Sequence, residues 1–143
     1  MLERRKARHQ ALHILYQREI TDDQVSRILA DGSWSVEDGA PSDFCREVIT
    51  GVEAHQARID AIIEDISENW ALSRMPLVDR SILRLAVYEM LYREDVPESV
   101  SINEAVEMAK VYGGGDSSKF VNGILGRLAE VAAAGGFEES VDE

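Results

Sequence analysis

Two histidines at helical spacing are the first residues in the sequence that could do chemistry. His9 and His13 lie four residues apart, which would place both imidazoles on one face of a helix in reach of a single metal ion. The glutamate that a zinc protease places after the first histidine is absent, and His55 is the one other imidazole in the chain. Since a catalytic zinc ion normally takes three protein ligands, we expect no metal site. We interpret His9 and His13 as exposed or interface residues.

A glycine-rich segment is the second candidate. Residues 113–119 read Gly-Gly-Gly-Asp-Ser-Ser-Lys, but the segment lacks the Gly-Lys-Ser/Thr ending of a nucleotide-binding loop and no strand is predicted before it. The glycines favour the end of one helix, and Asp116 or Ser117 favours the N-cap of the next. A helix N-terminus offers free N–H groups to phosphate, and an aromatic ring can stack a base. Lys119 and Phe120 are therefore candidate contacts to single-stranded RNA, although the spacing of Phe120 equally fits a core residue.

A basic amino-terminal segment is the third candidate, and it contrasts with the rest of the chain. The first 20 residues carry a net charge of +3 within a total of −12, so the remainder carries −15. The four cations that open the chain are Arg4, Arg5, Lys6 and Arg8. An acidic surface repels polyphosphates and suits a basic protein partner. Contacts to nucleic acid should therefore be confined to this arm and to the region of Lys119.

No catalytic arrangement is found in the sequence. The carboxylates of the second half of the chain show no spacing that would place two of them around one substrate, and no nucleophile-elbow pattern occurs. Cys45 lies at helical spacing with apolar neighbours, as a buried small residue does. We therefore predict a protein with no enzymatic activity, no catalytic residues and no cofactor.

Length and composition favour a single helical domain. The chain has 143 residues, of which 45% are hydrophobic and 6% aromatic, with three prolines. This is enough apolar material for one core, and so few prolines and aromatics argue against a turn-rich β-sandwich. One cysteine cannot form an intrachain disulfide, which favours a reducing, cytoplasmic location. No apolar run is long enough to span a membrane.

Apolar residues recur at spacings of three and four residues along most of the chain, which predicts an all-α bundle of about seven helices. We expect one domain over 1–143, with an N-terminal subdomain at about 3–70 and a C-terminal subdomain at about 76–133 that share one core. The acidic tail, 134–143, is expected to be disordered. Four helix starts are predicted from capping patterns: Asp22 or Asp23, Ser42, Ser101 with Glu104 as a capping box, and Asp116 or Ser117.

Three stretches together resemble the NusB family of bacterial transcription antitermination factors. They are the basic start at 4–8, the block Val-Asp-Arg-Ser-Ile-Leu-Arg-Leu-Ala-Val-Tyr-Glu at 78–89, and the blocks at 102–105 and 116–123, Ile-Asn-Glu-Ala and Asp-Ser-Ser-Lys-Phe-Val-Asn-Gly. The blocks after the basic start are the specific ones. The likeness spans roughly residues 3–130 and leaves out 32–41 and the acidic tail.

The resemblance implies an all-helical, non-enzymatic protein that acts in transcription antitermination. Members of the family bind the boxA element of ribosomal RNA leaders together with the small-subunit ribosomal protein NusE. The pair helps to load other antitermination factors onto RNA polymerase. At matching positions the resemblance implies RNA contacts by Arg4, Arg5, Lys6, Arg8, Lys119 and Phe120, and NusE contacts by Tyr16 and Asp79. Relatives often have glutamate where this chain has Asp79, so we expect the shorter side chain to weaken or shift that contact.

Two other interpretations stay open. The bundle could be a homodimeric protein-interaction module in which the same surfaces are buried and the RNA surface is occluded. It could also be a stand-alone relative of the helical RNA-binding domain that precedes some RNA cytosine methyltransferases. In that case it would have an accessory role, because no cofactor-binding sheet is predicted in the sequence.

Overall fold

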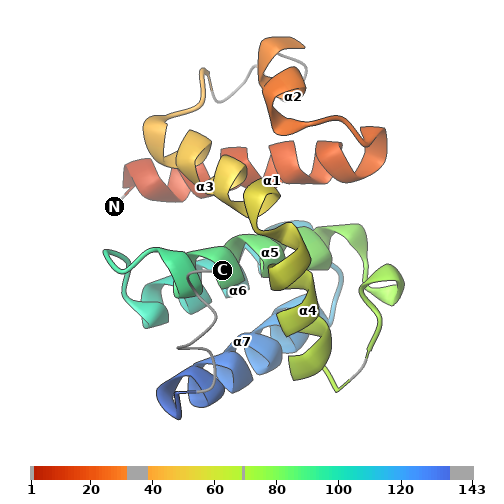
Figure 1. Ribbon diagram of the computed structural model, residues 1–143, viewed down its shortest axis with the longest axis vertical. Helices are drawn as coiled ribbons and strands as arrows, with labels where there is room; N and C mark the ends of the chain where they lie inside the picture. Colours follow the sequence, from red (N-terminus) through yellow and green to blue (C-terminus); the bar gives the residue numbers. More distant parts are fainter. Residues whose placement is uncertain (1, 32–38, 69, 136–143) are drawn as a thin grey trace.

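The computed structural model describes residues 2–31, 39–68 and 70–135, and it confirms the predicted all-α class (Figure 1). The described residues form seven α-helices and one 3₁₀ turn, with no strand among them. In chain order the elements are α1 (Leu2–Thr21), α2 (Val25–Asp31), α3 (Asp43–Ala54), α4 (Gln56–Ile66), η1 (Leu72–Arg74), α5 (Leu77–Tyr92), α6 (Glu98–Tyr112) and α7 (Ser117–Ala133). None of the helices in these ranges has the length and apolar character that a membrane span requires. Most of the tail predicted to be disordered, 136–143, lies outside the described residues.

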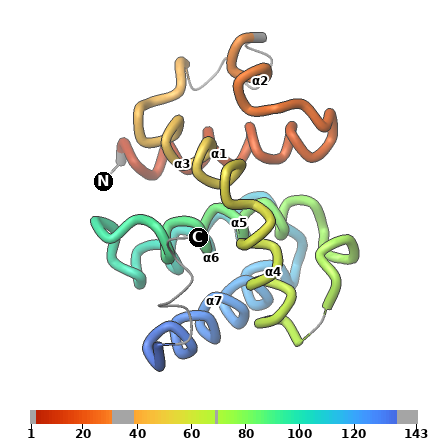
Figure 2. The backbone as a smooth tube through the Cα atoms, viewed as in Figure 1, coloured from red at the N-terminus to blue at the C-terminus, as the bar shows by residue number. Residues whose placement is uncertain are grey.

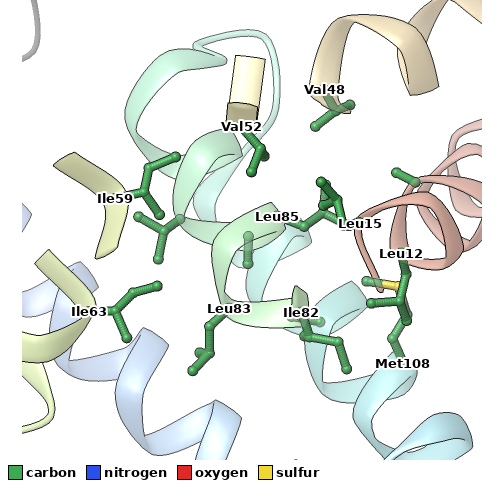
Figure 3. Packing of buried hydrophobic residues seen from close by; sticks show 14 of the residues in the cluster. Leu12, Leu15, Val48, Val52, Ile59, Ile63, Ile82, Leu83, Leu85 and Met108 are labelled. Atoms are coloured by element: carbon green, nitrogen blue, oxygen red, sulfur yellow. The ribbon is translucent and has the colours of Figure 1, made fainter. Parts of the chain in front are cut away.

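Helix α5 is the element around which the others pack. Every residue from Ser81 to Val87 is buried, so this helix has no solvent face over two turns. It contacts α1, α3, α4, α6 and α7. Figure 3 shows Ile82, Leu83 and Leu85 of α5 within a cluster that also contains residues of α1, α3, α4 and α6. A helix with so wide an apolar face belongs in the interior, and the buried charged side chains of α5 at Arg84 and Glu89 are paired with other helices.

The other helices form two groups around α5 (Figures 1 and 2). Helices α1, α2 and α3 pack together on one side, and α4, α6 and α7 lie on the other. Helix α4 packs against α5 and α7, although the sequence analysis assigned residues up to about 70 to the N-terminal subdomain. Buried ion pairs tie the groups together, because Arg84 of α5 binds both Asp60 of α4 (2.8 Å) and Glu19 of α1 (2.9 Å).

The boundary between α3 and α4 lies at His55. The His55 ring stacks on Tyr92 with ring centroids 4.2 Å apart, and Tyr92 stacks on Tyr88 at 5.3 Å. Gly51 makes room for this stack, since a Cβ atom at Gly51 would lie 2.2 Å from the Tyr88 ring. The break therefore coincides with an aromatic stack that joins α3, α4 and α5.

One of the predicted helix caps at the start of the chain is confirmed and one is wrong. The Ser42 hydroxyl accepts a hydrogen bond from the Cys45 N–H (3.3 Å), as an N-cap does. The Asp22 or Asp23 cap of α2 is not formed. The Val25 N–H instead donates to the Glu53 carboxylate of α3 (2.8 Å), so a residue 28 positions away replaces the local cap.

The predicted cap of α6 is also wrong, and that of α7 is right in position but lacks the side-chain hydrogen bond. Helix α6 begins at Glu98 after Pro97, and Ser101 is buried inside it, where its hydroxyl donates to Glu89 (3.2 Å). Asp116 occupies the N-cap position of α7 without a side-chain cap hydrogen bond. The Ser117 hydroxyl accepts from the Gly114 N–H (2.9 Å) and so closes the preceding turn.

Candidate functional site

The first turns of α1 carry the predicted basic arm, and its two more exposed arginines, Arg4 and Arg5, are paired with carboxylates. Arg5 binds the Glu104 carboxylate of α6 with Nε at 3.2 Å and Nη2 at 3.0 Å. Arg4 binds Asp95 at 3.0 Å. Lys6 is exposed and makes no hydrogen bond or ion pair with the described residues. Both arginines keep about half of their side chain exposed, so a phosphate can reach them in competition with the carboxylates.

Arg8, the fourth predicted cation, is buried and faces the core. Its side chain is 4% exposed, and its guanidinium donates three hydrogen bonds to Glu89 of α5 at 2.7 to 3.1 Å. The Ser101 hydroxyl completes the site by donating to the same carboxylate. A buried, fully hydrogen-bonded pair of this kind fixes orientation. Arg8 therefore anchors the arm to α5 and does not present its charge to solvent.

Phe44 of α3 provides a second anchor that the sequence analysis did not identify. The guanidinium carbons of Arg4, Arg93 and Arg8 lie 4.5, 5.0 and 5.2 Å from the centre of its ring. A cation that lies over an aromatic ring is attracted by the negative charge on the face of the ring, which is a cation–π interaction. Hydrogen bonds from Arg93 and Arg4 to Asp95 hold the pKa of that carboxyl well below its usual range. The arm is thus a fixed surface built on Phe44 and Asp95.

Lys119 and Phe120 lie on a cleft of about 310 Å³ between the end of α4 and the start of α7. The cleft is lined by Ile66, Ser67, Glu68, Lys119, Phe120, Gly123, Ile124 and Arg127. Lys119 is exposed. Phe120 is half-buried against the core, and the exposed Trp70 meets it edge-on with ring centroids 5.1 Å apart. The ring therefore packs on the core, as its spacing allows, and also lines the cleft, while an RNA contact by Phe120 stays a prediction.

The arm and the cleft lie at opposite ends of α6. Arg4 contacts Asp95, just before α6 begins, and His9 contacts Tyr112 at the end of α6 (2.8 Å), so α1 and α6 run in the same direction. Helix α7 starts beyond that far end (Figure 1). The structure does not bring the cations of α1 and Lys119 together in one site. A ligand that contacts both must follow the length of α6.

A second cleft, which we call the apolar groove, lies between α1, α5 and the end of α6. It has a volume of about 430 Å³ and is lined by Leu12, His13, Tyr16, Gln17, Ile20, Val78 and Tyr112. Ile20 is 60% exposed at its edge. The Tyr112 ring meets both His9 and His13 edge-on, with centroids 5.4 Å apart in each case. Tyr16, a predicted protein-partner contact, is thus part of a wide apolar surface.

Asp79, the other predicted partner contact, is buried in the first turn of α5 beside Val78 of the groove. Its side chain is 4% exposed, and its Oδ1 atom has no hydrogen-bond partner among the described residues. Buried carboxylate oxygens are almost always hydrogen-bonded, so an unpartnered one invites a donor. Position 79 therefore offers an acceptor that the described chain leaves unused.

Within the described part of the chain, the histidines are not grouped with other metal-ligand residues. Over the ranges that the structure describes, no group of three or more His, Cys, Asp or Glu residues is placed to hold a metal ion. His9 and His13 instead flank Tyr112, next to the apolar groove.

Comparison with known proteins places the chain among antitermination proteins. Residues 5–130 match the sequence profile of the NusB family. The transcription antitermination protein NusB of Rubrobacter xylanophilus is 44% identical over 124 residues, which cover 87% of this chain and 88% of that protein. NusB of Myxococcus xanthus is 45% identical over 132 residues, which cover 88% and 94% of the two chains.

Solved structures show the same fold. A crystal form of T. maritima NusB is similar with a TM-score of 0.79 and 38% identity, covering 94% of this chain and 96% of that one. A chain from the crystal structure of antitermination factors NusB and NusE in complex with dsRNA has a TM-score of 0.76, with 92% and 98% covered. The second is 23% identical, so its likeness is one of fold.

Proposed function

Because this chain belongs to the NusB family, whose members are transcription antitermination factors and not enzymes, we propose that it binds boxA RNA of ribosomal RNA leaders jointly with NusE. The joint complex would help to assemble other antitermination factors on RNA polymerase, and the protein would act in the cytoplasm. A structural neighbour solved as NusB and NusE in complex with dsRNA supports the pairing of one protein ligand with one RNA ligand.

The observation that carries this proposal is that one helix bears two different surfaces. The amino-terminal turns of α1 present Arg4, Arg5 and Lys6, and its carboxyl-terminal half lines the apolar groove through residues 12–20. Cations on a fixed backbone bind phosphate, and a wide apolar groove binds protein. A single rigid element that carries both is suited to an adaptor which holds RNA and protein together.

In the proposal, RNA contacts the exposed cations and the cleft at the start of α7. Arg4, Arg5, Lys6 and Lys119 supply phosphate contacts, and Phe120 supplies a face on which a base can stack. Arg8 acts through Glu89 as a positioning residue, since its guanidinium is buried.

The protein partner would occupy the apolar groove. Tyr16 would contact NusE directly. Asp79 would have to turn outward from its buried position before its unpaired Oδ1 atom accepts a hydrogen bond from a basic or hydroxyl side chain of the partner. A second copy of this chain is the alternative occupant. It would bury the same exposed Ile20 and Tyr112 and give the homodimer considered above.

RNA titration with and without NusE tests the proposal. We expect boxA-like RNA to bind better than a scrambled strand, and more tightly when NusE is present. Phe120→Ala should erode the sequence preference, and Arg5→Ala should lower the salt dependence of binding. Arg46→Ala, which removes an exposed cation from α3, is the matched control for Arg5→Ala.

Tyr16→Ala separates the two ligands. It should weaken binding to NusE and leave the affinity for RNA alone unchanged. No RNA binding under any condition, together with a tight dimer that Tyr16→Ala dissociates, would contradict the proposal and favour the homodimer.

A further inference from the structure

The cleft beside Phe120 contains charged groups that the proposed function does not yet use. Arg127, two turns along α7 from Lys119, lines the same cleft. Its guanidinium is paired with Glu68, which follows the end of α4. Both side chains are more than half exposed, so the pair is open to solvent and to ligands.

Glu68 also has an unusual backbone conformation, directly after the C-cap residue of α4. Glu68 has φ +60°, in the left-handed region that a non-glycine residue seldom adopts, and Asp22 is the one other such residue among those described. Strained positions of this kind cluster at ligand sites. Here the strained residue holds a carboxylate against an arginine at the rim of a cleft.

The floor of the cleft leaves space next to the aromatic ring. Gly123 lines the cleft, and a Cβ atom built on it would have no neighbour within 4 Å. One wall is Phe120, whose ring is held edge-on by Trp70. At about 310 Å³ the cleft is at the lower end of the range for small-ligand sites, which suits a part of a polymer such as one nucleotide.

We infer that this cleft is a single-nucleotide subsite for single-stranded RNA, in which Phe120 stacks the base and Arg127, released from Glu68, joins Lys119 in binding phosphate. The inference rests on the proposed function and adds Arg127, Glu68 and Gly123 to it. Glu68 competes with phosphate for Arg127, and so it acts as a specificity-determining residue. A strand that fills the cleft with a base displaces the carboxylate, whereas phosphates alone meet a neutralised arginine.

Titration of the full chain with boxA-like RNA at several salt concentrations tests the role of Arg127. Arg127→Gln should lower the affinity about 3- to 10-fold and reduce the slope of log K against log salt by about 0.7, the value for one phosphate contact to a single strand. Arg46→Gln is the matched control, since it removes an exposed cation from α3, and it should change neither quantity. An effect of Arg127→Gln no larger than that of Arg46→Gln would overturn the inference.

The opposite effect is expected at Glu68. Glu68→Gln keeps the side-chain shape and removes the competing charge, so scrambled RNA should bind several-fold more tightly and the preference for boxA-like RNA should fall. Asp22→Asn removes a carboxylate from the other position with positive φ and should leave both affinities unchanged. Unchanged binding of scrambled RNA by Glu68→Gln would show that the carboxylate does not compete.

A series of RNA strands, each with an abasic site at a different position, locates the nucleotide that stacks on Phe120. One abasic position should weaken binding to the native chain, and the same strand should lose nothing further with Phe120→Ala, because both changes remove the same contact. Additive losses at every position would overturn stacking in the cleft. If the native chain binds neither strand, with or without NusE, the proposed function fails together with the subsite. If it binds boxA-like RNA while the Arg127, Glu68 and Phe120 variants behave as their controls, only the subsite fails.

Discussion

Asp116 places a negative charge three residues before Lys119, at the start of α7. Its side chain is exposed and makes no cap hydrogen bond, so it contributes little to the stability of the helix. Asp116→Asn should therefore raise the affinity for RNA about 2- to 5-fold, because a charge that repels phosphate is removed. The melting temperature should stay the same. RNA titration and thermal unfolding measure the two effects, and unchanged or weaker RNA binding would contradict this expectation.

Cys45 is inert for a reason that the structure makes explicit. The thiol is fully buried in α3, and burial raises its pKa to about 12. At neutral pH the side chain is therefore the protonated thiol, which is a poor nucleophile. We expect no alkylation of the folded protein at pH 7 to 8 and rapid alkylation in denaturant, followed by mass spectrometry. Rapid modification of the folded protein would contradict the burial of this residue.

The four basic residues of the arm show how far a sequence pattern can distinguish exposed cations from buried ones. As a charge run they predict one exposed surface, and for Arg4, Arg5 and Lys6 the structure agrees. Arg8 precedes Leu12 by four residues and so shares the apolar face of α1, which is a helical signal for burial. Its partner Glu89 lies 81 residues away, and local periodicity carries no information on such a contact.

The ion pair of Arg8 and Glu89 joins α1 to α5, and its loss should be costly. Glu89→Gln removes the carboxylate that accepts the hydrogen bonds of Arg8 and leaves the buried charge with the more distant Glu104 carboxylate (3.9 Å), and we expect a loss of about 3 kcal/mol in the free energy of unfolding. Urea unfolding measures the loss. The double variant Arg8→Met/Glu89→Leu removes both charges and should be less destabilised than Glu89→Gln. A double variant as unstable as Glu89→Gln, or a loss below about 1 kcal/mol in Glu89→Gln, would show that the buried charge is not the cause.

Gly51 permits α3 to approach Tyr88 of α5. Gly51→Ala should destabilise the protein by about 1–3 kcal/mol, because the added methyl group collides with a ring that is itself stacked. Gly126→Ala is the control, since a Cβ atom there meets nothing within 4 Å, and it should be neutral or stabilising by up to about 1 kcal/mol. Equal unfolding free energies for the two variants would contradict the close contact at Gly51.

Helices α2, α4 and α6 show why the boundaries of helices were predicted less well than the presence of helices. Periodic apolar residues specify each helix, whereas a cap is decided by whichever acceptor is nearest in space. Glu53 caps α2 from another helix, and Ser101 turns away from a cap to donate to Glu89. The position of α4 against α7 likewise depends on the break at His55, which rests on a stack with Tyr92 that is distant in sequence.

At the scale of the whole molecule, a net charge of −12 should make salt act in opposite directions on stability and on RNA binding. Salt screens the mutual repulsion of the acidic surface, and exposed ion pairs contribute too little to offset this gain. We expect the melting temperature to rise modestly between about 20 and 200 mM salt, while the affinity for RNA falls. Thermal unfolding and RNA titration in the same buffers provide the comparison. A melting temperature that falls with salt would show that ion pairs dominate.

The all-α class follows from composition and periodicity, because it depends on patterns within single helices. The clefts do not follow, because each is made by several helices. Val78 and Tyr112 join Tyr16 in the apolar groove across more than 60 residues of sequence, and Arg127 reaches Glu68 across 59. Such surfaces appear only once the helices are packed.

Helix α1 is one unbroken helix of 20 residues, with cations at one end and the wall of a groove at the other. Because the helix is rigid, a protein ligand in the groove and RNA on the cations would be held at a fixed separation. We therefore expect any contact between these two ligands to couple their binding without a change of shape in α1. The factor by which the protein ligand tightens RNA binding must equal the factor by which RNA tightens protein binding.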